Sequence, residues 1–280
     1  MSLKFPVRVT PKTGLLDIPL SEVVRYRGMI RMLVKRNYQV QNKQMVLGPI
    51  WIIGETVISS GLFSFVFGTV GHFQSDGIPY FLFFLLGNTL WNLLSACTSK
   101  NANVFMENSY LFGKVYFPRL TVPLANMLYE LIPFCIRFVV CMIIWAFSYA
   151  RGEVGFGGWY FLLIPVLVIQ TALLGVSVGM LISSLTTKYR DLHHAVTLGL
   201  QLLMYTAPIV YPTAQLPAAL QRYVLLNPVS SVVELFRFCV IGSGTVHWGA
   251  WVYSLLLTAV LVLGSLILFN QVEKTFIDIV

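Results

Sequence analysis

The first feature of this sequence that could do chemistry is a small set of ionisable side chains within long apolar runs. Glu55, Glu130 and Arg137 each lie inside such a run. Ionisable groups in apolar surroundings often relay ions or line a polar passage. Glu55 and Glu130 lie near the ends of their runs, and Arg137 lies deeper. Three interpretations of Arg137 remain open: a buried structural ion pair, a snorkelling side chain and a role in a polar conduit.

Metal binding and nucleotide binding find little support. His193 and His194 follow Asp191 without a cysteine or second acid at ligand spacing, so we predict the start of a helix and no metal site. The only Gly-Lys pair, Gly113-Lys114, lacks the preceding glycine and following hydroxyl of a phosphate-binding loop. The four cysteines form no CxxC pair and are expected to be small core residues: Cys97, Cys135, Cys141 and Cys239.

The composition of the chain identifies the elements that must position these groups. Of the 280 residues 57% are hydrophobic and 11% are charged, with a mean hydropathy of +0.77. Soluble domains carry about 25% charged residues, so we predict an all-α, polytopic membrane protein. Six apolar segments are long enough to be expected as membrane spans: about 49–70, 79–98, 122–149, 159–185, 195–211 and 248–270.

Residues 213–247, between the fifth and sixth segments, predict a helical hairpin. Two apolar stretches, about 216–226 and 229–241, are separated by Asn227-Pro228. Each stretch is too short to span a membrane, and the proline disfavours one continuous helix. Helices that insert halfway and fold back fit best, and a soluble cap is the alternative.

Residues 22–51 predict a basic amphipathic helix that leads into the first apolar segment. Cations surround an apolar stripe, so we expect the helix to lie in the membrane plane, with the stripe toward acyl chains. A surface helix of a soluble domain is the alternative. The stripe consists of Tyr26, Met29, Ile30, Leu33 and Val40, with Val23 and Val34 at its edge. The cations are Arg25, Arg27, Arg31, Lys35 and Arg36. The predicted divisions are therefore 1–48, 49–270 and 271–280.

The positions of the basic residues predict the orientation. With a cytoplasmic N-terminus, most of the 19 lysines and arginines fall on the cytoplasmic side. The opposite side receives Arg151, Arg222 and Arg237. We therefore expect both termini to be cytoplasmic and the hairpin to face outward. No cleavable signal peptide is expected, because the first 48 residues are polar and basic.

Two cytoplasmic loops have the character of docking sites. The first carries Lys114 and the segment Tyr116-Phe117-Pro118-Arg119, which we interpret as exposed aromatic side chains beside fixed charge. The second includes Tyr189, Arg190 and Asp191. Both are short and bounded by predicted helices, so a push on either loop would move the spans. Simple charge anchoring at the membrane surface explains the cations but not the aromatic residues.

Aromatic residues are abundant, with 20 Phe, 13 Tyr and 6 Trp. Several lie along the predicted spans and could stack on sugar rings in a passage, although contacts with lipid or other helices explain most of them. The candidates for such a passage are Phe81, Phe84, Trp91 and Tyr205, together with Glu55, Glu130 and Arg137.

An ordered set of short motifs resembles a known family over essentially the whole chain. The motifs are LGPIW at 47–51, the segment 108–119 ending in KVYFPR, Pro123, Tyr189-Arg190-Asp191, Pro208, Tyr211-Pro212, Asn227-Pro228 with Arg237, and the tail 273–278. On a six-span layout, this order is similar to the membrane subunit of type-2 ABC exporters that carry O-antigen, capsule or teichoic acid polysaccharides.

The resemblance implies a homodimer with two copies of a separate ATP-binding subunit in a bacterial inner membrane. ATP and Mg would be bound by that partner, and this chain would hold no cofactor and bind no nucleic acid. The substrate would be a lipid-linked polysaccharide of the O-antigen type that passes between the protomers among membrane lipids. The residues implied to contact the ATPase are Arg31, Lys35, Arg36, Lys114, Tyr116, Phe117, Arg119, Tyr189, Arg190 and Asp191. An outer gate would include Asn227, Pro228, Glu234 and Arg237.

One residue departs from the family pattern. Family members often have an acidic residue after the arginine of the interfacial helix, whereas this chain has Asn37 after Arg36. Three other functions stay open as alternatives. They are an exporter of a small hydrophobic molecule, a membrane-embedded glycosyl- or acyltransferase, and an ion-coupled carrier that uses Glu55, Glu130 or Arg137.

Overall fold

The computed structural model describes residues 20–42, 48–114, 117–186 and 192–279, and the regular elements in these ranges are helices. Their order in the chain is α1 (Leu20–Arg25), α2 (Arg27–Asn42), α3 (Pro49–Phe63), η1 (Ser64–Val70), α4 (Tyr80–Ala102), α5 (Val104–Glu107), α6 (Ser109–Lys114), α7 (Thr121–Ala150), η2 (Gly158–Leu163), α8 (Ile164–Thr186), α9 (Leu192–Thr206), η3 (Thr213–Gln215), α10 (Ala218–Leu226), α11 (Pro228–Ile241) and α12 (Trp248–Ile279). The element η1 is a π-helix that continues α3.

Five helical segments of the described chain are long and apolar enough to cross a membrane, which confirms the prediction of an all-α polytopic protein. They are Pro49–Val70, Tyr80–Ala102, Thr121–Ala150, Gly158–Leu185 and Trp248–Val272. These bounds agree within a few residues with five of the six predicted spans. Helices α10 and α11 taken together are also long and apolar enough to cross a membrane, but the chain bends by 99° between them.

The predicted fifth span, about 195–211, is shorter than expected. Helix α9 ends at Thr206, and its 15 residues extend only about 22 Å at 1.5 Å per residue. A bilayer core is about 30 Å thick. Residues 207–210 are irregular but buried, and the carbonyls of Ile209 and Val210 accept hydrogen bonds from Arg237 and Tyr80. Irregular backbone is tolerated at membrane depth when it is buried in protein and hydrogen-bonded in this way.

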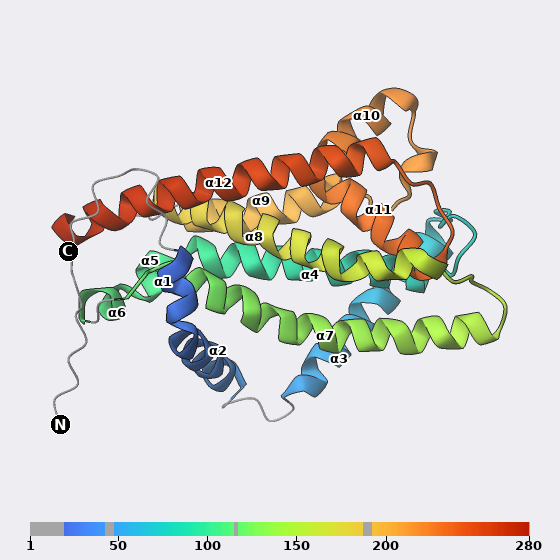
Figure 1. The fold of residues 1–280 in the computed structure, drawn as a ribbon. Helices are drawn as coiled ribbons and strands as arrows, with labels where there is room; N and C mark the ends of the chain where they lie inside the picture. The colour runs from blue at the N-terminus through green and yellow to red at the C-terminus, as the bar shows by residue number, and fades with distance from the viewer. Residues whose placement is uncertain (1–19, 43–47, 115–116, 187–191, 280) are drawn as a thin grey trace.

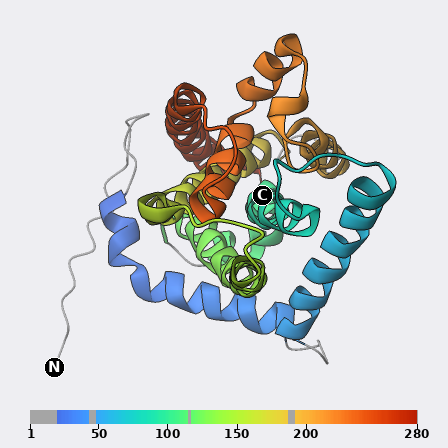
Figure 2. The same ribbon diagram turned by 90° about the vertical axis from the view of Figure 1, so that its right-hand side faces the viewer.

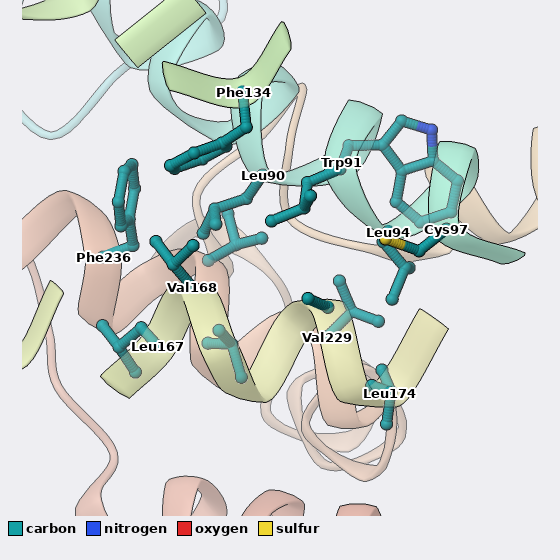
Figure 3. Close-up of a cluster of buried hydrophobic side chains, with 14 of the residues drawn as sticks. Leu90, Trp91, Leu94, Cys97, Phe134, Leu167, Val168, Leu174, Val229 and Phe236 are labelled. Atoms are coloured by element: carbon teal, nitrogen blue, oxygen red, sulfur yellow. The ribbon is translucent and has the colours of Figure 1, made fainter. Parts of the chain in front are cut away.

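Helix α4 is the centre of the bundle, and α7, α8, α9 and α11 pack around it (Figures 1 and 2). Residues 82–91 of α4 are all buried. Figure 3 shows part of this core, to which α4 contributes Leu90, Trp91, Leu94 and Cys97, α7 contributes Phe134, α8 contributes Leu167, Val168 and Leu174, and α11 contributes Val229 and Phe236. Cys97, Cys141 and Cys239 are buried as predicted, whereas Cys135 is exposed.

Two glycines allow α8 to approach α4 closely. A Cβ atom on Gly175 would lie 2.7 Å from the Leu94 carbonyl oxygen, and one on Gly179 would lie 2.6 Å from that of Thr98. Small residues at this four-residue spacing are typical of tight packing between membrane helices. The segment also matches the Gly-x-Ser-x-Gly pattern of hydrolase nucleophiles. However, Ser177 lies within a helix and donates to the Leu173 carbonyl at 2.6 Å, so helix packing explains the pattern.

The predicted hairpin is present as α10 and α11. Asn227 caps α11, because its side-chain oxygen accepts from the Val229 N–H at 3.1 Å, and Pro228 occupies the first turn. Ser254 of α12 donates to the Pro228 carbonyl at 2.7 Å. Helix α11 is mostly buried in the bundle, whereas α10 has no buried residue. The soluble-cap alternative therefore does not fit α11, which is part of the core.

The amphipathic segment forms α1 and α2, which lie across one end of the bundle beside α7 (Figure 2). We call this end the α2 end; α5, α6 and the C-terminal part of α12 also lie there (Figure 1). The expectation that the apolar stripe faces acyl chains is wrong for Val23, Ile30 and Leu33, which belong to the protein core. Val40, which we placed on the stripe, is 73% exposed. The stripe docks the helix onto the bundle, and Arg25, Arg27, Arg31 and Lys35 remain exposed.

Candidate functional site

A polar groove lies between α3, α4 and α7 and contains all three of the ionisable residues predicted within apolar runs. Its volume is about 390 Å³. Glu55 comes from α3, and Glu130 and Arg137 come from α7. The remaining lining includes Trp51, Asn92, Ser95, Ser99, Lys100, Tyr129 and Pro133. We refer to this site as the polar groove.

Two ion pairs hold the acids of the polar groove. Arg137 Nη2 lies 3.7 Å from Glu55 Oε2, and Lys100 Nζ lies 2.7 Å from Glu130 Oε1. The Lys100 ammonium also lies 3.7 Å from the centre of the Tyr129 ring. Arg137 therefore forms an ion pair and lines the polar groove. Its role in a polar conduit stays a prediction. Its buried Nε has no hydrogen-bond acceptor within the described ranges.

Helix α7 contains an interior proline beside these ion pairs. Pro133 has no N–H for the helical hydrogen bond to the carbonyl of Tyr129, four residues earlier. This carbonyl belongs to a residue that lines the polar groove, as does the proline itself. The proline thus removes one helical hydrogen bond from α7 at the position of the polar groove.

A second cavity of about 620 Å³ adjoins the polar groove at the α2 end, and we call it the Arg36 cavity. The two spaces share Gln41 and Lys100 in their linings, and Lys100 donates to Gln41 Oε1 at 2.8 Å. Further lining comes from Arg36, Asn37, Val40, Glu107, Asn108 and Asn126. The polar surface therefore extends from the interfacial helix into the space between the spanning helices.

A chain of side-chain amides joins α2 to the bundle. Asn37 donates to Asn126 of α7 at 2.9 Å, and Asn126 donates to Asn101 of α4 at 3.3 Å. Asn101, which is fully buried, donates in turn to the Cys97 carbonyl at 2.8 Å. Asn37 is the residue that departs from the family pattern. The structure gives it an uncharged partner in α7.

The residues implied to contact a partner ATPase are only partly exposed. Arg31 and Lys35 are exposed on α2, but Arg36 is half-buried and donates to Asn108 at 3.0 Å. The interpretation of Phe117 as an exposed aromatic is wrong, because it is 5% exposed and packs 5.8 Å from the Phe112 ring. Arg119 is also buried, above that ring. Tyr116, Tyr189, Arg190, Asp191 and the Lys114 side chain lie outside the described residues.

The aromatic candidates separate into core and surface residues. Phe84 is fully buried and stacks on Phe63 at 4.4 Å, and Trp91 is 5% exposed, so both contact protein and we withdraw them as lining residues. Phe81 is half-buried. Tyr205 of α9 is 57% exposed and is the one of these four that offers most of its ring to another molecule.

Arg237 of the hairpin is a structural residue at the opposite end of the bundle. It is 4% exposed, its Nε donates to the Phe83 carbonyl at 3.1 Å, and its Nη2 donates to the Ile209 carbonyl at 2.9 Å. Its guanidinium also lies 3.6 Å from the centre of the Phe83 ring. Glu234, which accepts from Thr213, lines a cavity of about 20 Å³ beside Arg237 and Asp76. Arg237 thus joins α11 to α4 and to the end of α9.

Lys100, Tyr129 and the three amides Asn37, Asn101 and Asn126 are site residues that the sequence reasoning did not select. Lys100 follows the predicted limit of the second span at about residue 98, yet α4 continues to Ala102 and carries it into the polar groove. Asn126 lies four residues before Glu130 and five after Thr121, within an apolar run. An amide in such a run is a signal that could have indicated a hydrogen bond between helices.

The Lys100–Glu130 pair yields the first prediction. Lys100→Met should lower the free energy of unfolding by about 3 kcal/mol, because Glu130 is buried and would lose its counter-ion. Adding Glu130→Gln should restore most of this loss. Thermal unfolding of the purified chain measures both effects. As a matched control, Arg151→Met breaks an exposed pair and should cost under about 1 kcal/mol. Equal losses for Lys100→Met and Arg151→Met would contradict the importance of the pair.

A bundle of apolar helices with a polar groove among them is the architecture of a membrane transport subunit. The chain belongs to the ABC-2 type transporter family, whose model matches residues 29–241. It is 25% identical over 253 residues to a protein named O-antigen export system permease protein RfbA from Klebsiella pneumoniae, covering 90% of this chain and 94% of that protein. A protein of the same name from Myxococcus xanthus is 23% identical, covering 77% of this chain and 81% of the relative.

Proposed function

We propose that this chain is the transmembrane subunit of an ATP-driven exporter that moves a lipid-linked polysaccharide of the O-antigen type across a bacterial inner membrane. The observation that carries the proposal is the polar groove between spanning helices, in a chain of the ABC-2 type transporter family. Two relatives that cover most of this chain are named O-antigen export system permeases. A passage for a small hydrophobic molecule would need no ion pairs or amides in its lining.

The lining of the polar groove is suited to sugars. Asn92, Ser95 and Ser99 supply amide and hydroxyl groups, which exchange hydrogen bonds with sugar hydroxyls as water does. Trp51 is 60% exposed at the start of α3 and offers a face for ring stacking. Charged and neutral hydrogen-bonding groups in one lining allow a polar chain to slide without a single deep binding site. In the assembled transporter, we place a second protomer beside this lining to close the passage.

Energy for export would come from a partner, since the sequence has no phosphate-binding loop of its own. In this proposal two ATPase subunits, which bind ATP and Mg, dock at the α2 end. Arg31 and Lys35 are exposed there on α2. The amides of Asn37, Asn126 and Asn101 would carry movement of α2 to α7 and α4. This subunit carries out no covalent chemistry. The α2 end would be cytoplasmic, together with both termini, which agrees with the predicted charge asymmetry.

Inactivation of the gene in its host tests the proposal. We expect the surface polysaccharide to be lost and a polyprenyl-linked glycan to accumulate at the inner leaflet, because synthesis continues without export. Complementation with the wild-type gene should restore the surface polysaccharide. Inactivation of the partner ATPase should produce the same accumulation. Normal surface polysaccharide in the mutant would contradict the proposal, as would transport by this chain alone in vesicles without ATPase.

A further inference from the structure

The Arg36 cavity contains a guanidinium that is held in place by neutral groups. Arg36 Nη2 donates to Asn108 Oδ1 at 3.0 Å and to Asn37 Oδ1 at 3.3 Å. Both amides are themselves fixed, because Asn108 donates to the Val104 carbonyl at 3.1 Å and Asn37 donates to Asn126 at 2.9 Å. The side chain is therefore positioned before any ligand arrives.

Arg36 differs from the other cations of this polar surface in its partners, which are amide oxygens and not carboxylates. Lys100 is paired with Glu130, and Arg137 is paired with Glu55. Within the described part of the chain, the contacts of Arg36 run through Nη2 to amide oxygens, and Nε and Nη1 have no acceptor. A guanidinium with a free edge is the group that binds phosphate oxygens in a two-pronged manner.

The location of the cavity indicates where its ligand comes from. Arg36 lies on α2, which crosses the end of the bundle and leads to the start of α3 at Pro49 (Figure 2). An amphipathic helix at the end of spanning helices lies at the depth of lipid headgroups, where the anions are phosphates. A cavity of about 620 Å³ also has room for a diphosphate and a first sugar.

We propose that the Arg36 cavity binds the phosphate groups of a membrane-anchored lipid. Arg36 supplies the charged donors, and Lys100 adds a second cation at the junction with the polar groove. A glycan attached to the bound phosphate would extend from the Arg36 cavity into the polar groove. The inference thus deepens the proposed function by naming the chemical group recognised at the lipid end of the substrate. Its test requires neither ATP nor export, so the two proposals can fail separately.

The test uses the full-length chain in phosphatidylcholine nanodiscs that contain increasing amounts of polyprenyl diphosphate, with binding followed by native mass spectrometry. We expect saturable binding, weakened about tenfold or more by Arg36→Gln, because a charge-assisted hydrogen bond is lost. The matched control is Arg27→Gln, which removes another exposed cation of α2 and should leave binding unchanged. Asn108→Ala keeps the charge but releases Arg36, and should weaken binding several-fold.

Four results would overturn the inference. Unchanged binding by Arg36→Gln, with a wild-type melting temperature, would show that Arg36 is not the binding group. An equal loss with Arg27→Gln would reduce the effect to general surface charge. Inorganic diphosphate can be added to the chain in phosphatidylcholine nanodiscs that contain no polyprenyl diphosphate. If it binds as tightly as the polyprenyl form, the cavity is a site for soluble phosphate instead of a lipid site. If Arg36→Gln lowers the melting temperature, unchanged binding by Asn108→Ala decides against the proposal.

Discussion

Replacement of Arg237 by methionine is expected to destabilise the protein by about 3–5 kcal/mol, a large part of the total stability of a typical protein. The variant loses two charge-assisted hydrogen bonds, to the carbonyls of Phe83 and Ile209. It thereby leaves these buried carbonyls without their donor. The ring contact with Phe83 is lost as well. Thermal unfolding in detergent and the yield of monodisperse protein measure the effect.

The matched control for this prediction is Arg222→Met. Arg222 lies on α10, at the same end of the molecule, and is exposed. Its replacement should change the melting temperature little. A wild-type melting temperature for Arg237→Met would show that α11 and the end of α9 do not depend on this side chain. That result would reopen a direct role for Arg237 in a gate.

Substitution of Gly179 by leucine is expected to separate α8 from α4. Even a Cβ atom would lie 2.6 Å from the Thr98 carbonyl oxygen and 2.7 Å from the Asn101 Cβ, so the two helices must move apart. Overpacking of this kind costs about 1–3 kcal/mol for a small addition, and leucine adds more. We expect alanine to be intermediate and leucine to prevent recovery of folded protein. Size-exclusion profiles and melting temperatures measure this series.

Gly264→Ala is the control for the glycine series. A Cβ atom at Gly264 of α12 would meet nothing within 4 Å. Alanine is a better helix former than glycine by about 1 kcal/mol, so this variant should be neutral or slightly more stable. Equal losses for Gly179→Ala and Gly264→Ala would contradict the assignment of close packing to the α4–α8 contact.

The fold class and most span limits could be predicted from the sequence. A long apolar run in lipid must form a helix, because only then do its backbone N–H and C=O groups hydrogen-bond to one another. The break at Asn227-Pro228 could also be predicted, since proline cannot continue a helix interior. The early end of α9 could not. Residues 207–211 are apolar, and although Pro208 marks a helix end, hydropathy alone placed them in the span. Their irregular backbone is held by hydrogen bonds from Arg237 and Tyr80, which come from distant parts of the chain.

The candidate site was predictable only in part. Glu55, Glu130 and Arg137 stand out because charge is rare in apolar runs, and the structure brings them into one groove. Lys100 and Asn101 were missed because they follow the predicted limit of the second span. Phe84, Trp91 and Phe117 were misjudged for a different reason. Hydrophobicity indicates that an aromatic residue avoids water, but not whether it contacts lipid, ligand or another helix.

The junction between α2 and α7 has a consequence for the conditions under which the protein works. Asn37, Asn126 and Asn101 join the interfacial helix to the bundle through groups that neither titrate nor carry a net charge. Ions in solution screen charged pairs but leave neutral amide hydrogen bonds almost unchanged. This amide part of the contact between the helix and the bundle should therefore hold equally well in acidic or alkaline medium and at low or high ionic strength.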